Sequence, residues 1–233
     1  MTYLDLINAV LVRLRENPVT TDNFQQDPYY RMIGASVNDA KDIVENAWQW
    51  SQLRGIDEVS VLQGATQVTL PDSAERDYLI SSILVQESGA YLRWAPLDWI
   101  KARYRNRYNK PVDQGNTFYY GFDLDDPTTG NQTIAIYPPT NKNINLNVSN
   151  VAHQQNLSNW DDRLLVPALP VYSMATALAS RERGEVGGAP VSELFTFADR
   201  VLSDAIAYDS SRFPEELIWY SPENLPETNV RGY

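Results

Sequence analysis

Few residues in this 233-residue chain could carry out covalent catalysis or hold a metal ion, because it contains one His and no Cys. Without Cys there is no thiolate nucleophile, no disulfide and no Cys-ligated metal centre. A Ser–His–acid triad would have to use His153, which lies in NVAHQQNLSNW without a GxSxG elbow nearby and is better explained as a linker histidine. No GxGxxG or GxxxxGK[ST] phosphate loop occurs. The sequence therefore predicts a protein that is not an enzyme and uses no cofactor.

The carboxylates offer one local cluster, the segment DLDD from Asp123 to Asp126. With Gly130 and Asn131 behind it, the cluster has a faint likeness to a calcium loop. However, Pro127 takes the position of a third ligand, and no Glu closes the loop. We interpret the segment as the acidic tip of a hairpin. No pair of acids is singled out for glycoside hydrolysis, so the prediction of no metal and no catalytic residue stands.

The strongest charge pattern is the basic run KARYRNRYNK, in which two tyrosines are interleaved and no acid occurs from Ile100 to Val112. Such a run can contact nucleic acid through phosphates and base stacking. It can equally pair with an acidic surface of a neighbouring subunit, or be solvated, and the sequence leaves these three readings open. As a candidate subunit or tail interface its cations are Lys101, Arg103, Arg105, Arg107 and Lys110.

The last 22 residues, 212–233, cannot form one helix because they contain three prolines. They also hold large apolar side chains, each of which would cost roughly 2 kcal/mol if left in water. The segment either folds back over its own domain or forms an arm for a partner, and an extended chain of this length reaches about 70 Å. We predict the arm, with these contact residues: Phe213, Leu217, Ile218, Trp219, Tyr220 and Tyr233.

The overall charge limits the classes of partner. With 30 acidic and 19 basic residues the formal net charge is -11, which argues against a protein that grips nucleic acid through its phosphates. It does not argue against a protein that DNA merely passes. No run approaches the ~18 consecutive apolar residues of a membrane helix, and the start MTYLDLINAVLVRLRE has no cationic leader or cleavage site. We expect no membrane contact and folding in a cytoplasm.

The elements that must position these residues begin with a helix pair over residues 1–54. Thr2 and Asp5 have the spacing of a capping box, Pro18 ends the first run, and Asp27 before Pro28 marks the second start. Apolar residues recur at helical intervals: Leu4, Ile7, Leu11 and Leu14, then Ile33, Val37, Ala40, Val44 and Ala47.

Between residues 55 and 152 the apolar period becomes two, which predicts an antiparallel β domain with one short helix at PLDWIKARYRN. Helical signals resume over 153–211. Pro167 and Pro170 suit a first turn, Gly184 ends that helix, and a last helix follows Pro190. One face of the last helix carries Leu194, Ala198, Val201, Ala205 and Tyr208.

We therefore predict an α+β fold. Residues 1–54 and 153–211 each supply a helix pair, and burying the two apolar stripes against each other gives a four-helix unit. The β domain 55–152 is inserted into this unit, and the segment 212–233 extends from it as a C-terminal arm.

Three segments together resemble the head-to-tail adaptor (connector) proteins of tailed bacteriophages, called tail tubular protein A in short-tailed phages. The first is the opening helix with PVTT and a second helix closing on NAWQWSQLRG. The second is IAIYPPTNKNINLNVSNVA, which looks like the family's β hairpin with a proline-rich tip. The third is DDRLLVPALPVYSMATALASRERGE, which is similar to its returning helix pair.

The resemblance implies a structural virion protein at the capsid–tail junction, made in the host cytoplasm. It implies a homo-oligomeric ring of twelve copies under the portal protein, with the helical unit packed side by side around the ring. A tail nozzle or other tail protein would bind below, the arm would grip the portal, and DNA would pass through the lumen without specific binding. Two alternatives stay open: another tail or head-completion component, and a carbohydrate-binding or hydrolase module built on the β domain.

Overall fold

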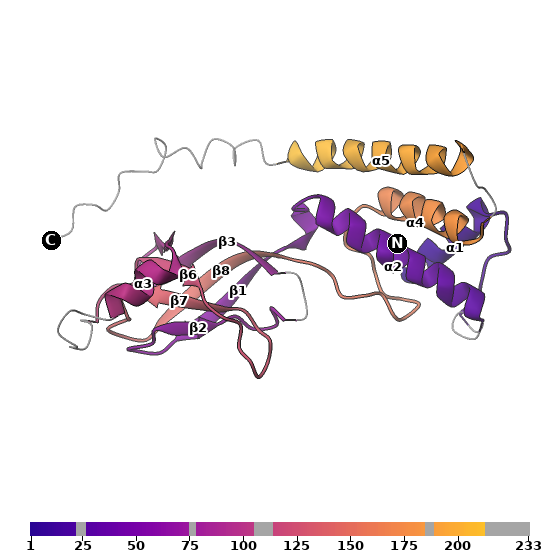
Figure 1. Cartoon of the computed structure of the whole chain (residues 1–233). Coiled ribbons are helices and arrows are strands. Elements are labelled where there is room, and N and C mark those ends of the chain that lie inside the picture. The colour runs from indigo at the N-terminus through magenta and orange to yellow at the C-terminus, as the bar shows by residue number, and fades with distance from the viewer. Residues whose placement is uncertain (22–26, 75–77, 105–113, 185–188, 213–233) are drawn as a thin grey trace. The chain divides into compact units, whose positions relative to one another are not determined.

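The computed structural model describes residues 1–21, 27–74, 78–104, 114–184 and 189–212. This part of the chain is mixed α+β, with five α-helices and two sheets in which most strand pairs are antiparallel (Figure 1). The chain divides into two compact units. Residues up to Ser51 and from Asn156 onward form the helical unit, and Gln52–Gln155 form the β unit.

Four of the helices belong to the helical unit and one belongs to the β unit. The helices are α1 (Tyr3–Arg13), α2 (Pro28–Ala47), α3 (Leu97–Tyr104), α4 (Ala168–Glu182) and α5 (Ala189–Ser210). A short 3-10 turn, η1 (Ser51–Leu53), follows α2.

Helix α1 has the predicted start but a different end. Thr2 and Asp5 form the capping box, each side chain bonding to the other's backbone N–H. The helix ends before Pro18, because Arg15 adopts a left-handed conformation (φ 61°). The N–H of Glu16 then bonds to the Leu11 carbonyl at 2.9 Å, which satisfies a carbonyl of the last turn. Pro18 is therefore not the residue that stops this helix.

Helix α2 starts where predicted, with the Asp27 side chain accepting from the Tyr29 N–H. Four of the five predicted apolar positions are buried, whereas Ala47, at the last turn, is exposed. The same face also buries Lys41 and Glu45, which the apolar pattern did not predict. Lys41 pairs with Asp42 at 2.7 Å and with Glu45 at 3.5 Å, so its charge is buried with partners.

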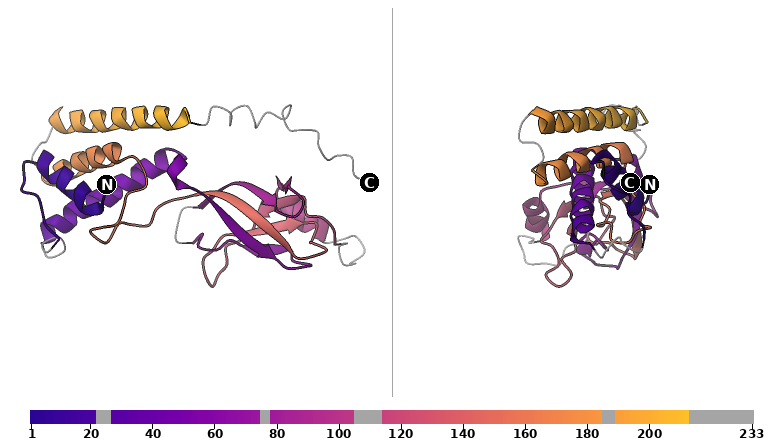
Figure 2. Two further views of the ribbon diagram at one scale, coloured as in Figure 1. Left: turned by 180° about the vertical axis from the view of Figure 1, so that it is seen from behind. Right: turned by 90° about the vertical axis from the view of Figure 1, so that its right-hand side faces the viewer.

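Helix α4 is the central element of the helical unit. It packs against α1, α2 and α5, and it consists mostly of small and medium side chains that allow close approach. Figure 2 shows α5 lying alongside α4 in views from behind and from the end. Within α5, Ala198 and Asp209 are buried, while Tyr208 is 68% exposed. The predicted apolar face is thus only partly covered.

The described residues of the β unit form eight strands in two four-stranded sheets, ordered β1-β8-β3-β4 and β2-β7-β6-β5. The strands are β1 (Arg54–Val61), β2 (Gln67–Thr69), β3 (Tyr78–Val85), β4 (Ala90–Tyr91), β5 (Arg93–Trp94), β6 (Tyr119–Phe122), β7 (Thr133–Tyr137) and β8 (Ile144–Ala152).

The two sheets bury one shared apolar core, to which alternate residues of the strands contribute, among them Val59, Ile83, Ile134, Leu146 and Val148. Helix α3 covers the outer face of the second sheet through Ile100, which is fully buried against Ala95 and Ala135. The β unit is therefore a sandwich with one helix on its outside.

One strand pair departs from the predicted antiparallel β domain, because β5 and β6 run parallel. The chain leaves β5, forms α3 and returns as β6, and such a crossover through a helix is the connection that parallel neighbours require. The other pairs of both sheets are antiparallel.

Candidate interaction surfaces

The residues predicted for the C-terminal arm lie outside the described residues: Phe213, Leu217, Ile218, Trp219, Tyr220 and Tyr233. The same holds for three cations of the basic run: Arg105, Arg107 and Lys110. The structure therefore places only Lys101 and Arg103 of the predicted site residues.

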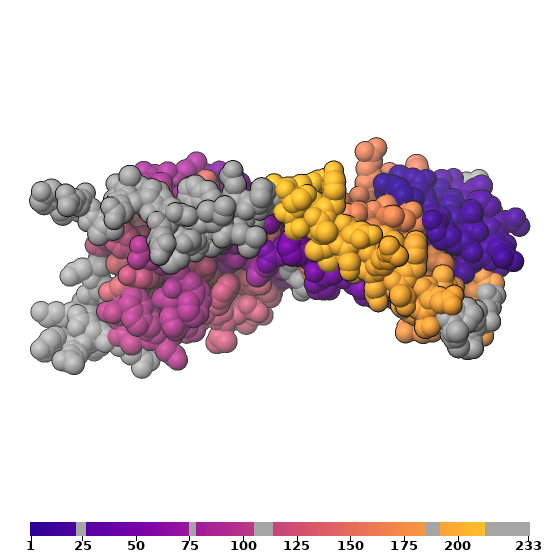
Figure 3. Space-filling model, turned by 90° about the horizontal axis from the view of Figure 1, so that it is seen from above, coloured from indigo at the N-terminus to yellow at the C-terminus, as the bar shows by residue number. Residues whose placement is uncertain are grey.

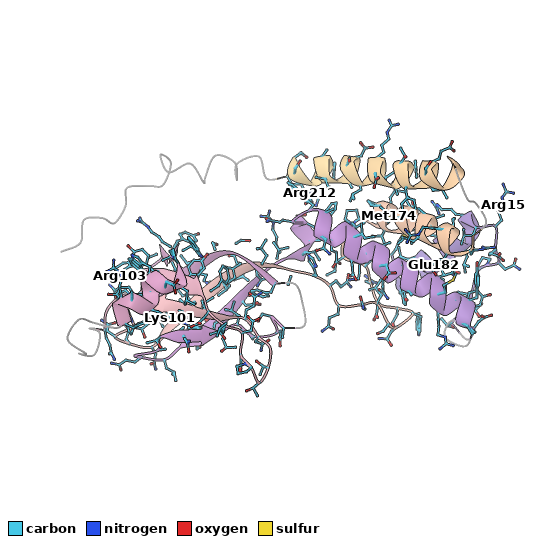
Figure 4. All side chains as sticks on the ribbon, viewed as in Figure 1. Arg15, Lys101, Arg103, Met174, Glu182 and Arg212 are labelled. Carbon is cyan, nitrogen blue, oxygen red and sulfur yellow. The ribbon has the colours of Figure 1, made fainter. Side chains whose placement is uncertain are left out.

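Both described cations of the basic run lie on α3 and bind residues of their own unit (Figure 4). Lys101 Nζ donates to Asp123 Oδ1 at 2.8 Å. The Arg103 guanidinium lies over the Trp99 ring, 3.8 Å from its centroid, a cation–π contact. Trp99 in turn meets Tyr119 edge-on. These contacts join α3 to the second sheet.

The acidic segment has structural contacts of the same kind. Burial raises the pKa of Asp123, but hydrogen bonds from Lys101, the Leu124 N–H and Gln67 outweigh it and hold the pKa below its usual value. The backbone N–H of Thr128, together with the hydroxyl of Thr129, lowers the pKa of Asp126. Asp123 is thus part of an ion pair and Asp126 part of a turn, which agrees with the interpretation of this segment as the acidic tip of a hairpin.

Across the described ranges, no three His, Asp or Glu side chains lie together as metal ligands would. None of the described helices is long and apolar enough to cross a membrane. The surfaces that stand out are apolar ones, since several large side chains are solvent-exposed in each unit. Exposed apolar groups that gather in one place mark interaction sites more often than scattered ones do.

The β unit exposes four aromatic rings on and beside the strands where its two sheets meet. Strand β4 ends the first sheet and β5 ends the second, with only the buried Leu92 between them. Trp94, 60% exposed, pairs with Tyr120, and alternate residues of β6 share one face. We call the exposed rings at this margin the aromatic edge: Tyr91, Trp94, Phe118 and Phe122.

The helical unit has a second group on α5. At 100° per residue, Phe197, Val201 and Tyr208 fall within about 40° of one another, beside the buried Ala198. Phe197 is 54% exposed and Tyr208 is 68% exposed, and Val201 between them is half-buried. Figure 3 shows α5 at the surface, next to α4. We call these three residues the α5 flank.

A third group surrounds the start of α1. The segment before α4 runs beside the first residues of the chain, with Leu4 N bonding to the Trp160 carbonyl and Leu164 N to the Met1 carbonyl, both at 3.1 Å. Trp160 is 50% exposed and the neighbouring apolar side chains are similarly exposed. We call the group the α1–α4 patch: Met1, Trp160, Leu165 and Leu169.

A buried carboxylate fixes the C-terminal end of α5. Asp209 accepts hydrogen bonds from Ser51 Oγ at 2.6 Å, Ser51 N at 3.0 Å and Trp48 Nε1 at 3.2 Å. Arg212 lies 3.7 Å from the same carboxylate. The end of α5, from which the predicted arm departs, is thus tied to the turn after α2.

The sequence did not single out the aromatic edge or the α1–α4 patch. Their only sequence signal is the high aromatic content, 11% of residues, which does not distinguish core rings from exposed ones. Asp209 looked like any other acid of the last helix. The sequence of the whole chain matches no protein-family model and none of the curated proteins compared with it.

Proposed function

We propose that this chain is a structural virion protein, a head-to-tail adaptor that forms a ring beneath the portal protein and connects the capsid vertex to the tail. Within it, α1, α2, α4 and α5 act as one four-helix assembly unit, and residues 212–233 are the arm that binds the portal. DNA passes through the lumen of the ring without specific binding.

The observation that carries the proposal is the distribution of exposed large apolar side chains over three separate places: the α5 flank, the α1–α4 patch and the aromatic edge. A subunit of an adaptor ring needs several such surfaces at once, because it has a neighbour on each side and a different protein above and below. Exposed aromatic residues suit this purpose, since they are enriched at the centres of protein interfaces.

The position of the predicted arm agrees with this assignment. The predicted arm begins at residue 212, two residues after α5 ends at Ser210, and Asp209 fixes that end through three hydrogen bonds. A binding segment attached to a fixed point loses less entropy on docking than one attached to a loose end.

Deleting residues 213–233 tests the arm. The shortened chain keeps Arg212 and all the described helices, so its helical circular dichroism should equal that of the full chain. Portal docking, measured by co-sedimentation with assembled portal, should be lost. Unchanged docking by a folded, shortened chain would reject the arm assignment.

The aromatic edge also favours a second candidate, a carbohydrate-binding module of the virion. Exposed rings such as Trp94 and Phe122 are the kind of side chain that stacks on sugar rings. Retention of the full chain on cell-wall or capsular polysaccharide, lost in Trp94→Ala, would favour this candidate. No retention of the full chain, or equal retention of both proteins on the polysaccharide, would count against it.

A further inference from the structure

Strand β1 ends the first sheet: among the described residues it has β8 on one side and no strand on the other (Figure 1). Gln86 N bonds to the Asn145 carbonyl, so Asn145 points its backbone groups toward β3 and Leu146 points its own toward β1. Val59, the partner of Leu146, therefore faces β8. The N–H and C=O groups at the free edge belong to alternate residues, which we call the outer-edge residues: Ile56, Glu58 and Ser60.

This edge is unusually open for a protein sheet. The other edge strands, β2, β4 and β5, are only two or three residues long, whereas β1 has eight. Short edge strands are one way in which proteins avoid unwanted pairing, and β1 lacks that protection. Ile56 is 71% exposed, and Leu62, directly after the strand, is 70% exposed. Both lie on the face of β1 opposite to the core residues Val59 and Val61.

The C-terminal segment of the same chain starts near this edge. Asp209 Oδ1 accepts from Ser51 Oγ at 2.6 Å, and Arg212 Nη1 donates to Ser51 Oγ at 3.3 Å. Ser51 precedes Arg54, the first residue of β1, by three positions, which span at most about 11 Å. Residue 213 and those after it therefore start within reach of the N-terminal end of β1.

The sequence of this segment suits a strand of matching length. Between Pro214 and Pro222 lies a run of seven residues without proline, EELIWYS, nearly as long as β1. Ile, Trp and Tyr favour strands, and a proline at each end limits the strand because it cannot donate a hydrogen bond to the ladder. Four large apolar residues in succession, 217–220, suit a strand that is covered on both faces.

An open edge and an apolar segment are both unfavourable in water, and one contact covers both. We propose that residues 215–221 of the free chain add to the outer edge of β1 as a further strand of the first sheet. The segment starts at the N-terminal end of β1, so it runs parallel to β1 and places Glu215 and Glu216 beside Arg54. Since these residues belong to the predicted arm, portal binding requires their release from β1. The release step rests on the proposed function, whereas the contact with β1 does not.

Amide hydrogen exchange measured by NMR tests the contact residue by residue. In the full chain, the N–H groups of the outer-edge residues should exchange about tenfold more slowly than in a chain that ends at Arg212. The N–H groups of Asp57, Val59 and Val61 face β8 and are the internal control, protected in both chains. Equal exchange of the outer-edge groups in the two chains would overturn the contact. Protection that persists in the shortened chain and grows with protein concentration would assign the edge to a second copy and also overturn it.

Proline substitutions test the same contact in a chain of full length. Ile218→Pro removes an N–H from the middle of the segment and should speed exchange of the outer-edge residues as the deletion does. Thr228→Pro lies outside residues 215–221 and is the matched control, which should keep the protection of the parent chain. Equal exchange of the outer-edge residues in the two proline variants would overturn the assignment of this segment.

Adding assembled portal separates the contact from the adaptor function. Portal should speed exchange over β1 in the full chain, as followed by mass spectrometry. Edge protection in a protein that never binds portal would support the contact and reject the function. Portal binding by a full chain without edge protection would reject the contact and leave the function standing. Portal binding that leaves the edge protection unchanged would reject the release step.

Discussion

Replacing Asp209 by Ala should strongly destabilise the helical unit, because this buried carboxylate accepts three hydrogen bonds from the turn after α2. The substitution removes the acceptor and leaves the Ser51 N–H and Trp48 Nε1–H without it. The exposed Arg212, at 3.7 Å, contributes little to the total.

The expected magnitude follows from these bonds. Hydrogen bonds to a charged group contribute about 1.5–3 kcal/mol, and an unsatisfied buried donor costs about 1–3 kcal/mol. Because the donors share one carboxylate and are only partly buried, we expect Asp209→Ala to lower the free energy of unfolding by about 3 kcal/mol. Asp209→Asn retains one acceptor oxygen but turns an amide N–H₂ toward donors, and should cost about 1–2 kcal/mol.

Urea denaturation followed by Trp fluorescence measures the change. Trp48 bonds to Asp209 directly, and the fully buried Trp50 donates to the Val44 carbonyl at 2.7 Å, so both report on this region. With a slope of about 2 kcal/mol per molar urea, the midpoint should fall by about 1.5 M in Asp209→Ala. Asp199→Ala, an exposed acid on the same helix, is the control and should shift it little. Equal midpoints for the two Ala variants would refute the role given to Asp209.

Three further predictions concern single positions. Gly121→Ala should lower the stability of the β unit by about 1–3 kcal/mol, because the new Cβ would lie 2.6 Å from the Ala95 carbonyl oxygen. Gly115→Ala is the control, since its new Cβ meets nothing closer than 4.0 Å. Thermal melts should show a lower melting temperature for Gly121→Ala than for Gly115→Ala. Arg15→Gly should stabilise the protein by about 1 kcal/mol in urea titrations, because Gly adopts its left-handed φ of 61° without strain. Asp123→Asn should make the stability of the protein depend less on pH in the acid range. The lowered pKa of Asp123 gives the parent chain a stabilisation that is present above about pH 4 and is lost as the pH falls through the folded-state pKa. Thermal melts of both proteins from pH 6 to 2 would record the difference.

The sequence predicted well those features that local chemistry determines. The capping box at Thr2 and the N-cap at Asp27 are encoded within three residues, and both are present. Alternation identified β1 and β8, where one face of the strand is buried, and β7, which is buried on both faces because α3 covers its outer side. The left-handed Gly184 at the end of α4 was visible for the same reason.

Features that depend on distant partners could not be read in this way. Strand β3, YLISSILV, follows no strict alternation, because a bulge between Ile80 and Ser82 shifts its register against β8. The parallel β5–β6 pair depends on a crossover, and β5 is only two residues long.

Buried charges were missed for a related reason. Lys41 and Glu45 are four residues apart on the apolar face of α2, and opposite charges at that spacing were the available signal for a buried pair. Asp209 bonds to Ser51, 158 residues away, and no local pattern reveals that contact. Whether an aromatic side chain is exposed, as Trp94 is, also depends on what the folded sheets leave uncovered.

The most direct test of the adaptor function is a mass measurement on the purified full chain mixed with its assembled portal protein, by native mass spectrometry. The proposal predicts a portal complex that gains a closed ring of twelve 26.5 kDa chains, with few partly filled rings between. A chain that stays monomeric and never adds to the portal mass would contradict it.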